Sequence, residues 1–284
     1  MQYHKPKNNF EVTELLNTFK NDAQIFAGGT DILVEARYNK KNLKEHWIDI
    51  SGISGLKQIK EIKKQISIGP MVTHSEIIRN DMIKQHAPLL AEACRVIGSL
   101  QIRNRGTIGG NICNASPCAD SIPALVVLDT QLVIDSSSGE QVLPISDFFI
   151  KPYMTILKPG RWLKEIRIMK MKAENKFAFL KLSRRNALAI SRMNFAVILQ
   201  IAWDNTIESV QFAPGSIFPI WRRVTKAEEF MLGKRISMEL FQEAGKIVAD
   251  SMIKESGRRW STPYKEPVVA ALTARVLAKA AGLD

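Results

Sequence analysis

"QIRNRGTIGGNICNASPCADSIPAL", residues 101–125, is the stretch that decides the fold. It carries Gly109 and Gly110 side by side, with a threonine before them and an asparagine after them. The stretch "QIFAGGTDILVEA", residues 24–36, repeats this order of apolar segment, paired glycines, polar residue and amphipathic segment. A glycine pair lets the backbone take positive φ and approach a ligand closely. Because converging amides bind anions, two such loops predict a ligand with two linked phosphates.

Neither loop is specific when it is taken alone, since most such glycine pairs form tight turns. The chain has no G-x-x-x-x-G-K-[ST] motif and no G-x-G-x-x-G motif after a strand. The hydroxyls of Thr30 and Thr107 and the amide of Asn111 add polar donors beside the glycines. The combination of two loops, and not either loop by itself, therefore favours a dinucleotide.

The composition predicts a globular chain of one large or several smaller domains. The 284 residues are 45% hydrophobic and 24% charged, which is ordinary for such proteins. No apolar run reaches the roughly 18 residues that span a bilayer, and the first residues lack the apolar core of a signal peptide. Three cysteines suit a reducing compartment and are too few for a closed cluster site of about four ligands. We therefore expect a cytoplasmic protein with no membrane span and no metal site of its own.

The net charge of +12 is unevenly distributed along the chain. Residues 1–150 hold 16 basic and 16 acidic residues, whereas residues 151–284 hold 24 and 12. This asymmetry indicates either an anionic ligand or acidic partner at the C-terminal half, or a solvated basic face. Arg184 and Arg185 are candidates to attract a dinucleotide phosphate, and Arg103 and Arg105 flank the second loop.

Hydrophobic periodicity divides the chain into two α/β units and an α+β unit. In the first unit we expect helices at 10–20 and 31–40 and strands at 23–29 and 46–50. In the second we expect hairpins at 56–70 and 130–145, a capping box formed by Thr73 and Glu76, and one helix over 81–98.

The third unit begins where the pattern changes, near residue 170. Three antiparallel strands are expected at 177–186, 193–203 and 207–217. Two amphipathic helices follow at 237–253 and 267–282, with Ser237 and Thr262 as N-caps. The predicted domains are 1–55, 56–170 and 171–284.

The two loops together resemble the FAD-binding (medium) subunit of the molybdenum hydroxylases, of the xanthine dehydrogenase and carbon monoxide dehydrogenase types. The quoted motifs are "FAGGTDILVEAR" at 26–37 and "QIRNRGTIGGNICNASPCADSIPALVVLD" at 101–129. "FAFLKLSRRNALAISRMNFAV" at 177–197 and "RRWSTPYKEPVVAALTARVL" at 258–277 are similar to that family's C-terminal domain. The resemblance implies an α+β chain with a vanillyl-alcohol-oxidase/MurB-type FAD-binding fold of two α/β subdomains, plus a C-terminal domain with a three-stranded antiparallel sheet and helices.

The resemblance also implies cofactor-binding residues. It places the first pyrophosphate loop on Ile25, Phe26, Ala27, Gly28, Gly29, Thr30, Asp31 and Ile32, and the second on Thr107, Ile108, Gly109, Gly110 and Asn111. It places Ile97 near the flavin ring, Asp120 at an acidic contact and Leu163 at a backbone contact. A basic contact falls on Lys181, for which Leu180 competes by a shift of one residue.

The function implied by the resemblance is electron transfer. A large molybdenum-cofactor subunit oxidises the substrate, a small [2Fe-2S] subunit carries the electrons, and FAD on this chain passes them to an acceptor, with NAD favoured. We expect no general acid or base on this chain, because electron transfer does not require one. A stand-alone FAD-dependent oxidoreductase of the same fold is the alternative. A basic nucleic-acid-binding protein is disfavoured, because no helix-turn-helix, zinc or RNP-like motif occurs.

Overall fold

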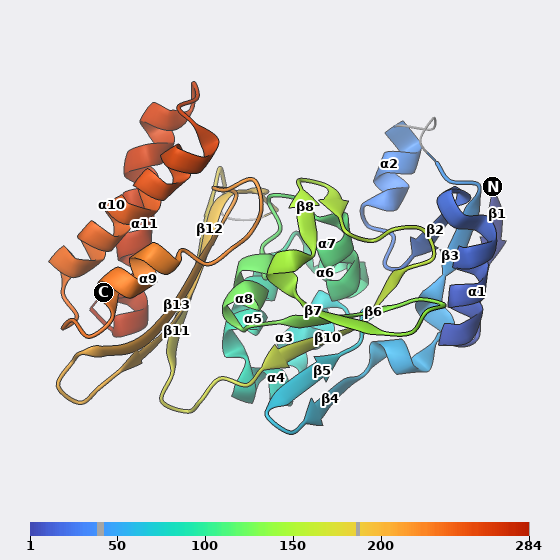
Figure 1. Cartoon of the computed structure of the whole chain (residues 1–284), viewed down its shortest axis with the longest axis horizontal. Helices are drawn as coiled ribbons and strands as arrows, with labels where there is room; N and C mark the ends of the chain where they lie inside the picture. Colours follow the sequence, from blue (N-terminus) through green and yellow to red (C-terminus); the bar gives the residue numbers. More distant parts are fainter. Residues whose placement is uncertain (39–42, 186–187, 284) are drawn as a thin grey trace.

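The computed structural model describes residues 1–38, 43–185 and 188–283 (Figure 1). A small parallel sheet opens the chain, with strand order β1 (Gln2–His4), β3 (His46–Asp49) and β2 (Ala23–Phe26). Helix α1 (Asn9–Phe19) begins at the N-cap Asn8 and packs Val12 and Leu16 against this sheet, and α2 (Ile32–Tyr38) follows the first glycine loop. Except for β1, the described elements of this unit agree with the prediction.

A second, five-stranded antiparallel sheet forms the middle of the molecule. Its order is β4 (Ile59–Ile62), β5 (Gln65–Ile68), β10 (Trp162–Met169), β6 (Gln131–Asp135) and β7 (Gln141–Pro144). The two predicted hairpins are confirmed, but the central strand β10 between them was not predicted. It comes from a segment far along the chain, so its pairing is not a local signal. A short hairpin of β8 (Phe149–Lys151) and β9 (Met154–Thr155) lies after β7.

Six short helices cover this sheet: α3 (His74–Arg79), α4 (Asp81–His86), α5 (Pro88–Arg95), α6 (Leu100–Arg105), α7 (Ile108–Asn114) and α8 (Ser121–Val127). The capping box at the start of α3 is confirmed, with Thr73 and Glu76 bonded reciprocally. The single helix predicted over 81–98 is wrong. Ala87 leaves the helical conformation and Pro88 starts a new helix, because proline cannot donate to the preceding turn.

The C-terminal unit is the predicted three-stranded antiparallel sheet, β11 (Lys176–Ser183), β12 (Ser191–Ile201) and β13 (Ile207–Gly215). Helices α9 (Thr225–Met231), α10 (Met238–Ser256) and α11 (Thr262–Ala281) follow. Ser237 caps α10 as expected. Thr262 does not cap α11. It is the first helical residue, and its hydroxyl accepts from the backbone N–H of Arg259.

The C-terminal sheet lies between two helical layers, as Figure 1 shows. Side chains of one face, among them Phe179, Ala196 and Ala213, join the core under α5 and α8. Side chains of the other face, including Ala178, Phe195 and Phe212, pack with α10 and α11. The period-2 alternation of a strand thus decides which side chains of β11 reach the middle unit. The α+β class is confirmed.

Candidate functional site

The two glycine loops pack directly against each other, although about 80 residues separate them. A Cβ built on Gly28 would lie 2.0 Å from the carbonyl oxygen of Arg105 and 3.2 Å from the Cα of Gly106. No side chain fits at such a distance, so glycine is required at position 28 for this contact. The backbone of the first loop therefore touches the segment that leads into the second.

The second loop differs from the prediction, because Ile108, Gly109, Gly110 and Asn111 form the first turn of α7. Thr107 is the N-cap, and its hydroxyl accepts from the N–H of Gly110 at 3.1 Å. The amides of Ile108 and Gly109 donate to the carbonyls of Val72 and Pro70. Both glycines have φ outside the left-handed region. Here the small residues allow close packing, since a Cβ on Gly109 would lie 2.4 Å from the Pro70 ring.

The first loop keeps its backbone donors free. Gly29 has φ of +79°, the left-handed conformation expected of a glycine turn. Within the described residues, none of the amides from Gly28 to Asp31 donates to a protein acceptor. Thr30 and Asp31 are side by side, with their side-chain oxygens 3.4 Å apart. Buried or half-buried amides usually have partners, so this run of open donors suits an anionic ligand.

A cavity of about 300 Å³ lies between the two loops and the first sheet. Its walls include three residues predicted to bind the first phosphates, Phe26, Ala27 and Gly28, and one from the second loop, Thr107. The remaining lining residues are Tyr3, Asp49, Ser51, Lys57, Met71, Thr73, Glu76, Asn104 and Arg105. The volume is at the lower end of the range for small-molecule sites, enough for part of a dinucleotide.

Tyr3 and Asp49 are cavity residues that the sequence did not reveal. They come from β1 and β3, whose parallel register sets Tyr3 opposite Trp47. The Tyr3 hydroxyl donates to the Asp49 carboxylate, and this bond, with burial, raises the pKa of Tyr3 to about 12. Burial opposes ionisation of Asp49, but the bonds from Tyr3 and from the Ser51 N–H outweigh it and lower its pKa. The pair thus places a fixed negative charge in the cavity wall.

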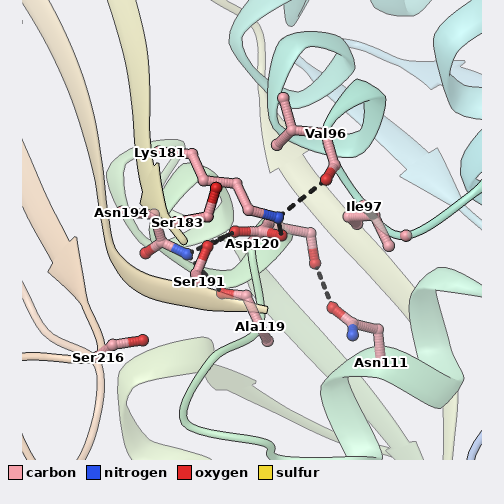
Figure 2. A network of polar contacts seen from close by, with 12 residues as sticks. Val96, Ile97, Asn111, Ala119, Asp120, Lys181, Ser183, Ser191, Asn194 and Ser216 are labelled. Atoms are coloured by element: carbon pink, nitrogen blue, oxygen red, sulfur yellow. Dashed lines mark hydrogen bonds and ion pairs between the residues drawn. The ribbon is translucent and has the colours of Figure 1, made fainter. Parts of the chain in front are cut away.

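A second polar cluster surrounds Asp120, as Figure 2 shows. One carboxylate oxygen accepts from the Lys181 ammonium at 2.7 Å. The other accepts from the Ser191 hydroxyl and from the Asn194 amide, the latter at 2.8 Å. All three donors belong to the C-terminal sheet, whereas Asp120 precedes α8 in the middle unit. Asn111 is adjacent, because its side-chain oxygen accepts from the Ser121 hydroxyl at 2.6 Å.

Lys181 and Leu180 are the two candidates for the basic contact, and as neighbours in β11 they point to opposite faces of the sheet. Leu180 packs with the core under α10 and α11, on the face away from Asp120. Lys181 lies on the opposite face, where its ammonium also donates to the Val96 carbonyl at 2.9 Å. The geometry therefore brings Lys181, and not Leu180, to the Asp120 cluster.

Ile97 lies beside this cluster, at the end of α5. The Arg103 guanidinium holds its backbone, donating to the carbonyls of Ile97 and Gly98 at 2.9 and 3.2 Å. The sequence offers Arg103 as a contact for a ligand phosphate, but in the structure its guanidinium is used to hold the backbone of Ile97 and Gly98. Arg105, in contrast, lines the cavity.

The other predicted residues lie around the loops or apart from them. Ile25 is half-buried against the first core, and Ile32 starts α2. Leu163 is buried in β10 opposite Ile134, and it is not among the cavity residues. The structure therefore brings Leu163 to neither polar cluster. Within the part of the chain that the structure describes, no three His, Cys, Asp or Glu side chains gather as metal ligands. No helix among the described residues could cross a membrane.

Comparison with known proteins decides the family. Residues 1–169 match the model described as "FAD binding domain in molybdopterin dehydrogenase", and residues 178–280 match "CO dehydrogenase flavoprotein C-terminal domain". The chain belongs to the FAD-binding subunits of the molybdenum hydroxylases. Its cofactor is therefore FAD, as the sequence predicts.

Relatives of this family align over almost the whole chain. The carbon monoxide dehydrogenase medium chain of Hydrogenophaga pseudoflava is 29% identical, over 97% of this chain and 95% of the relative. The nicotine 6-hydroxylase medium subunit of Paenarthrobacter nicotinovorans is also 29% identical, over 99% and 97%. A solved carbon monoxide dehydrogenase from Hydrogenophaga pseudoflava superposes with a TM-score of 0.90, at 29% identity, over 99% of this chain and 96% of that one.

The residues of this chain fit FAD. The open amides from Gly28 to Asp31 can bind a diphosphate, and Gly28 and Thr107 both line the cavity. Of the predicted loop residues, Phe26, Ala27, Gly28 and Thr107 line that cavity, whereas residues 29–32 and 108–111 are not among its lining residues. The binding role of each residue remains a prediction, since the family model names the cofactor and not its contacts.

Proposed function

We propose that this chain is the electron-relaying subunit of a three-subunit molybdenum hydroxylase. A large molybdenum-cofactor subunit would oxidise the substrate, and a small [2Fe-2S] subunit would carry electrons to this chain. NAD would be the final acceptor. The observation that supports the proposal is the backbone contact between Gly28 and Arg105, which brings the open amides of the first loop next to the segment that leads into α7.

The cofactor would extend from one polar cluster to the other. The amides of Gly28, Gly29, Thr30 and Asp31 would bind the diphosphate, with the hydroxyls of Thr30 and Thr107 as further donors. Ile97, Asp120 and Lys181 would lie at the flavin end, and Leu163 would contribute a backbone contact. When FAD is bound, it accepts electrons and passes them on as a hydride. The protein binds it, orients it and shields one face from water.

The partner subunits are inferred from the relatives. The relatives named above are a "medium chain" and a "medium subunit", and an Escherichia coli relative with 26% identity is named a putative xanthine dehydrogenase FAD-binding subunit. This chain has three cysteines, fewer than the four thiolates that an iron–sulfur cluster takes. We therefore assign the clusters to another chain, together with the specificity for a xanthine-like or other substrate.

The alternative is a stand-alone FAD-dependent oxidoreductase of the same fold. Such an enzyme needs a positioned base beside the flavin. The carboxylate nearest to that end, Asp120, already accepts from Lys181, Ser191 and Asn194. These three donors already occupy its oxygens and leave it poorly placed to move a proton, which favours the electron-relay function. We also propose that the chain divides at residues 55 and 170 into domains that fold independently.

Affinity purification from the native host, with a tag on this chain, tests the proposal. We expect one FAD per chain and two further polypeptides, identified by mass spectrometry as a molybdenum subunit and an iron–sulfur subunit. Anaerobic NADH should then bleach the flavin absorbance. A lone flavoprotein would support the alternative. A complex whose flavin ignores NADH would exclude NAD as the acceptor and leave the relay itself intact.

A further inference from the structure

Three cationic side chains converge at one end of the C-terminal unit. Arg192 is the second residue of β12, Arg259 lies between α10 and α11, and Lys265 is in the first turn of α11. The Arg192 guanidinium lies over the Tyr264 ring, 5.4 Å from its centre. The Lys265 ammonium donates to the carbonyl of Ser216 at 3.2 Å. These contacts hold the start of α11 against the start of β12 and against Ser216, which follows β13.

Among the described residues, the three cations have no carboxylate counter-ion. Across residues 1–38, 43–185 and 188–283, none of them forms an ion pair with a carboxylate. Glu266, the acidic residue next to Lys265, is instead paired with Arg258 at 3.1 Å. Burial, and then the charges of Arg259 and Arg192, lower the pKa of Lys265. Holding like charges together around a half-buried lysine is unfavourable, and a bound anion would offset that cost.

Lys265 lies close to the segment that leads to Asp120. Ser216 accepts from Lys265 through its carbonyl, while its hydroxyl donates to the carbonyl of Pro117, three residues before Asp120. Figure 2 shows Asn194 beside Asp120, and Ser216 directly follows β13. An anion at this place would therefore sit next to the flavin end of the proposed cofactor site.

The neighbouring aromatic side chains favour a nucleotide over an acidic protein surface. Trp260 is 96% exposed and Tyr264 47% exposed, and both flank the cations in the sequence. Exposed aromatic rings stack on bases, while Arg and Lys bind phosphate oxygens. The first turn of the 20-residue helix α11 adds a favourable dipole for negative charge.

We propose that Arg192, Arg259 and Lys265 form a phosphate-binding site for a dinucleotide electron acceptor, with Tyr264 and Trp260 beside its base. The proposal rests on the proposed function, because it supplies the acceptor site for the same flavin. It assigns the excess positive charge of residues 151–284, in part, to a ligand.

Calorimetric titration of the FAD-loaded full chain with ADP-ribose tests this site. ADP-ribose carries the base and diphosphate of the acceptor but cannot take a hydride. The variants are Lys265→Gln and Arg192→Gln, which keep hydrogen-bond donors but lose the charge. Lys279→Gln is the control, because Lys279 is exposed on the same helix, about 20 Å from Lys265.

The wild type and the control should bind ADP-ribose alike, and each charge-removing variant should weaken binding about tenfold or more, as expected for a charge-assisted hydrogen bond. Lys265→Arg should retain most of the affinity. Equal affinity of all variants, or no binding to flavin-loaded wild type, would overturn the site. If the variants instead lose the partner subunits, the cations bind an acidic protein surface, which also rejects the proposal. Absence of FAD from the wild type would reject the proposed function itself.

Discussion

The ammonium of Lys181 lies 2.7 Å from the carboxylate of Asp120, and this contact joins the C-terminal sheet to the middle unit. Both side chains are nearly buried, with 11% and 7% of their surface exposed. Ser191 and Asn194 occupy the second carboxylate oxygen. Asp120 is therefore the acceptor on which three donors of the C-terminal sheet depend.

Asp120→Ala should destabilise the protein strongly, because it leaves the buried Lys181 ammonium without its partner. Removal of one member of such a pair costs about 3–5 kcal/mol, measured as the free energy of unfolding in urea. Asp129→Asn is the control, since the Asp129–Arg223 pair also joins the two units but Asp129 is 52% exposed and asparagine tolerates its φ of +46°, so we expect less than about 1 kcal/mol. The double change Asp120→Ala with Lys181→Met should recover part of the loss. Equal costs for Asp120 and Asp129 would contradict this account.

Arg103 should act as a positioning residue for the flavin end of the site. One guanidinium nitrogen donates to the carbonyls of both Ile97 and Gly98, and lysine lacks the planar guanidinium that positions this nitrogen. Arg103→Lys should weaken FAD binding and alter the visible circular dichroism of the bound flavin, with little change in the thermal midpoint. Arg79→Lys, at an exposed position on α3, should change neither signal. A flavin spectrum identical to that of the wild type would show that the loop needs no such support.

His74 should make the protein acid-sensitive. Its side chain is 2% exposed, and burial, followed by the charge of Arg103, lowers its pKa from 6.5 to about 4. The unfolded chain then binds the extra proton more readily than the folded one. This stabilising contribution is complete above pH 6.5 and is lost as the pH falls toward 4, about 2 kcal/mol between pH 7 and 5. Unfolding titrations at several pH values should show this slope in the wild type and a smaller one in His74→Gln. Parallel slopes would mean that His74 titrates normally.

The sequence predicts the elements whose signals are local. The capping box at Thr73, the hairpins and the three C-terminal strands depend on neighbouring residues, and they were found where expected. The elements that were missed depend on distant partners. Strand β1 exists because it pairs with β3, and β10 because it lies between β5 and β6.

In the site, too, local features could be predicted and contacts between distant segments could not. The glycine pairs are visible in the sequence, but Tyr3 and Asp49 meet only through strand pairing. The second glycine pair was expected to lie in a loop but lies at the start of a helix. Thr107 caps this helix, and the carbonyls of residues 70 and 72 accept hydrogen bonds from its first amides. The choice between Leu180 and Lys181 needed the face of β11, which a motif alignment does not give.

Gly110 is less crowded than Gly28 and Gly109, so it is the glycine at which the cofactor site is best tested. A Cβ on Gly28 or Gly109 would strike backbone atoms, so changes there should impair folding. On Gly110 it would meet only the Thr107 hydroxyl, at 2.9 Å. A side chain at position 110 should therefore displace the hydroxyl of Thr107, which lines the cavity and caps α7, without striking the backbone.

The ratio of bound FAD to polypeptide in Gly110→Val is thus the most direct test that the two loops together bind one diphosphate. Flavin absorbance of the purified protein gives the ratio, and circular dichroism verifies that the variant is folded. We predict one FAD per chain for the wild type and nearly none for the folded variant. A folded variant with its full complement of FAD would contradict the account.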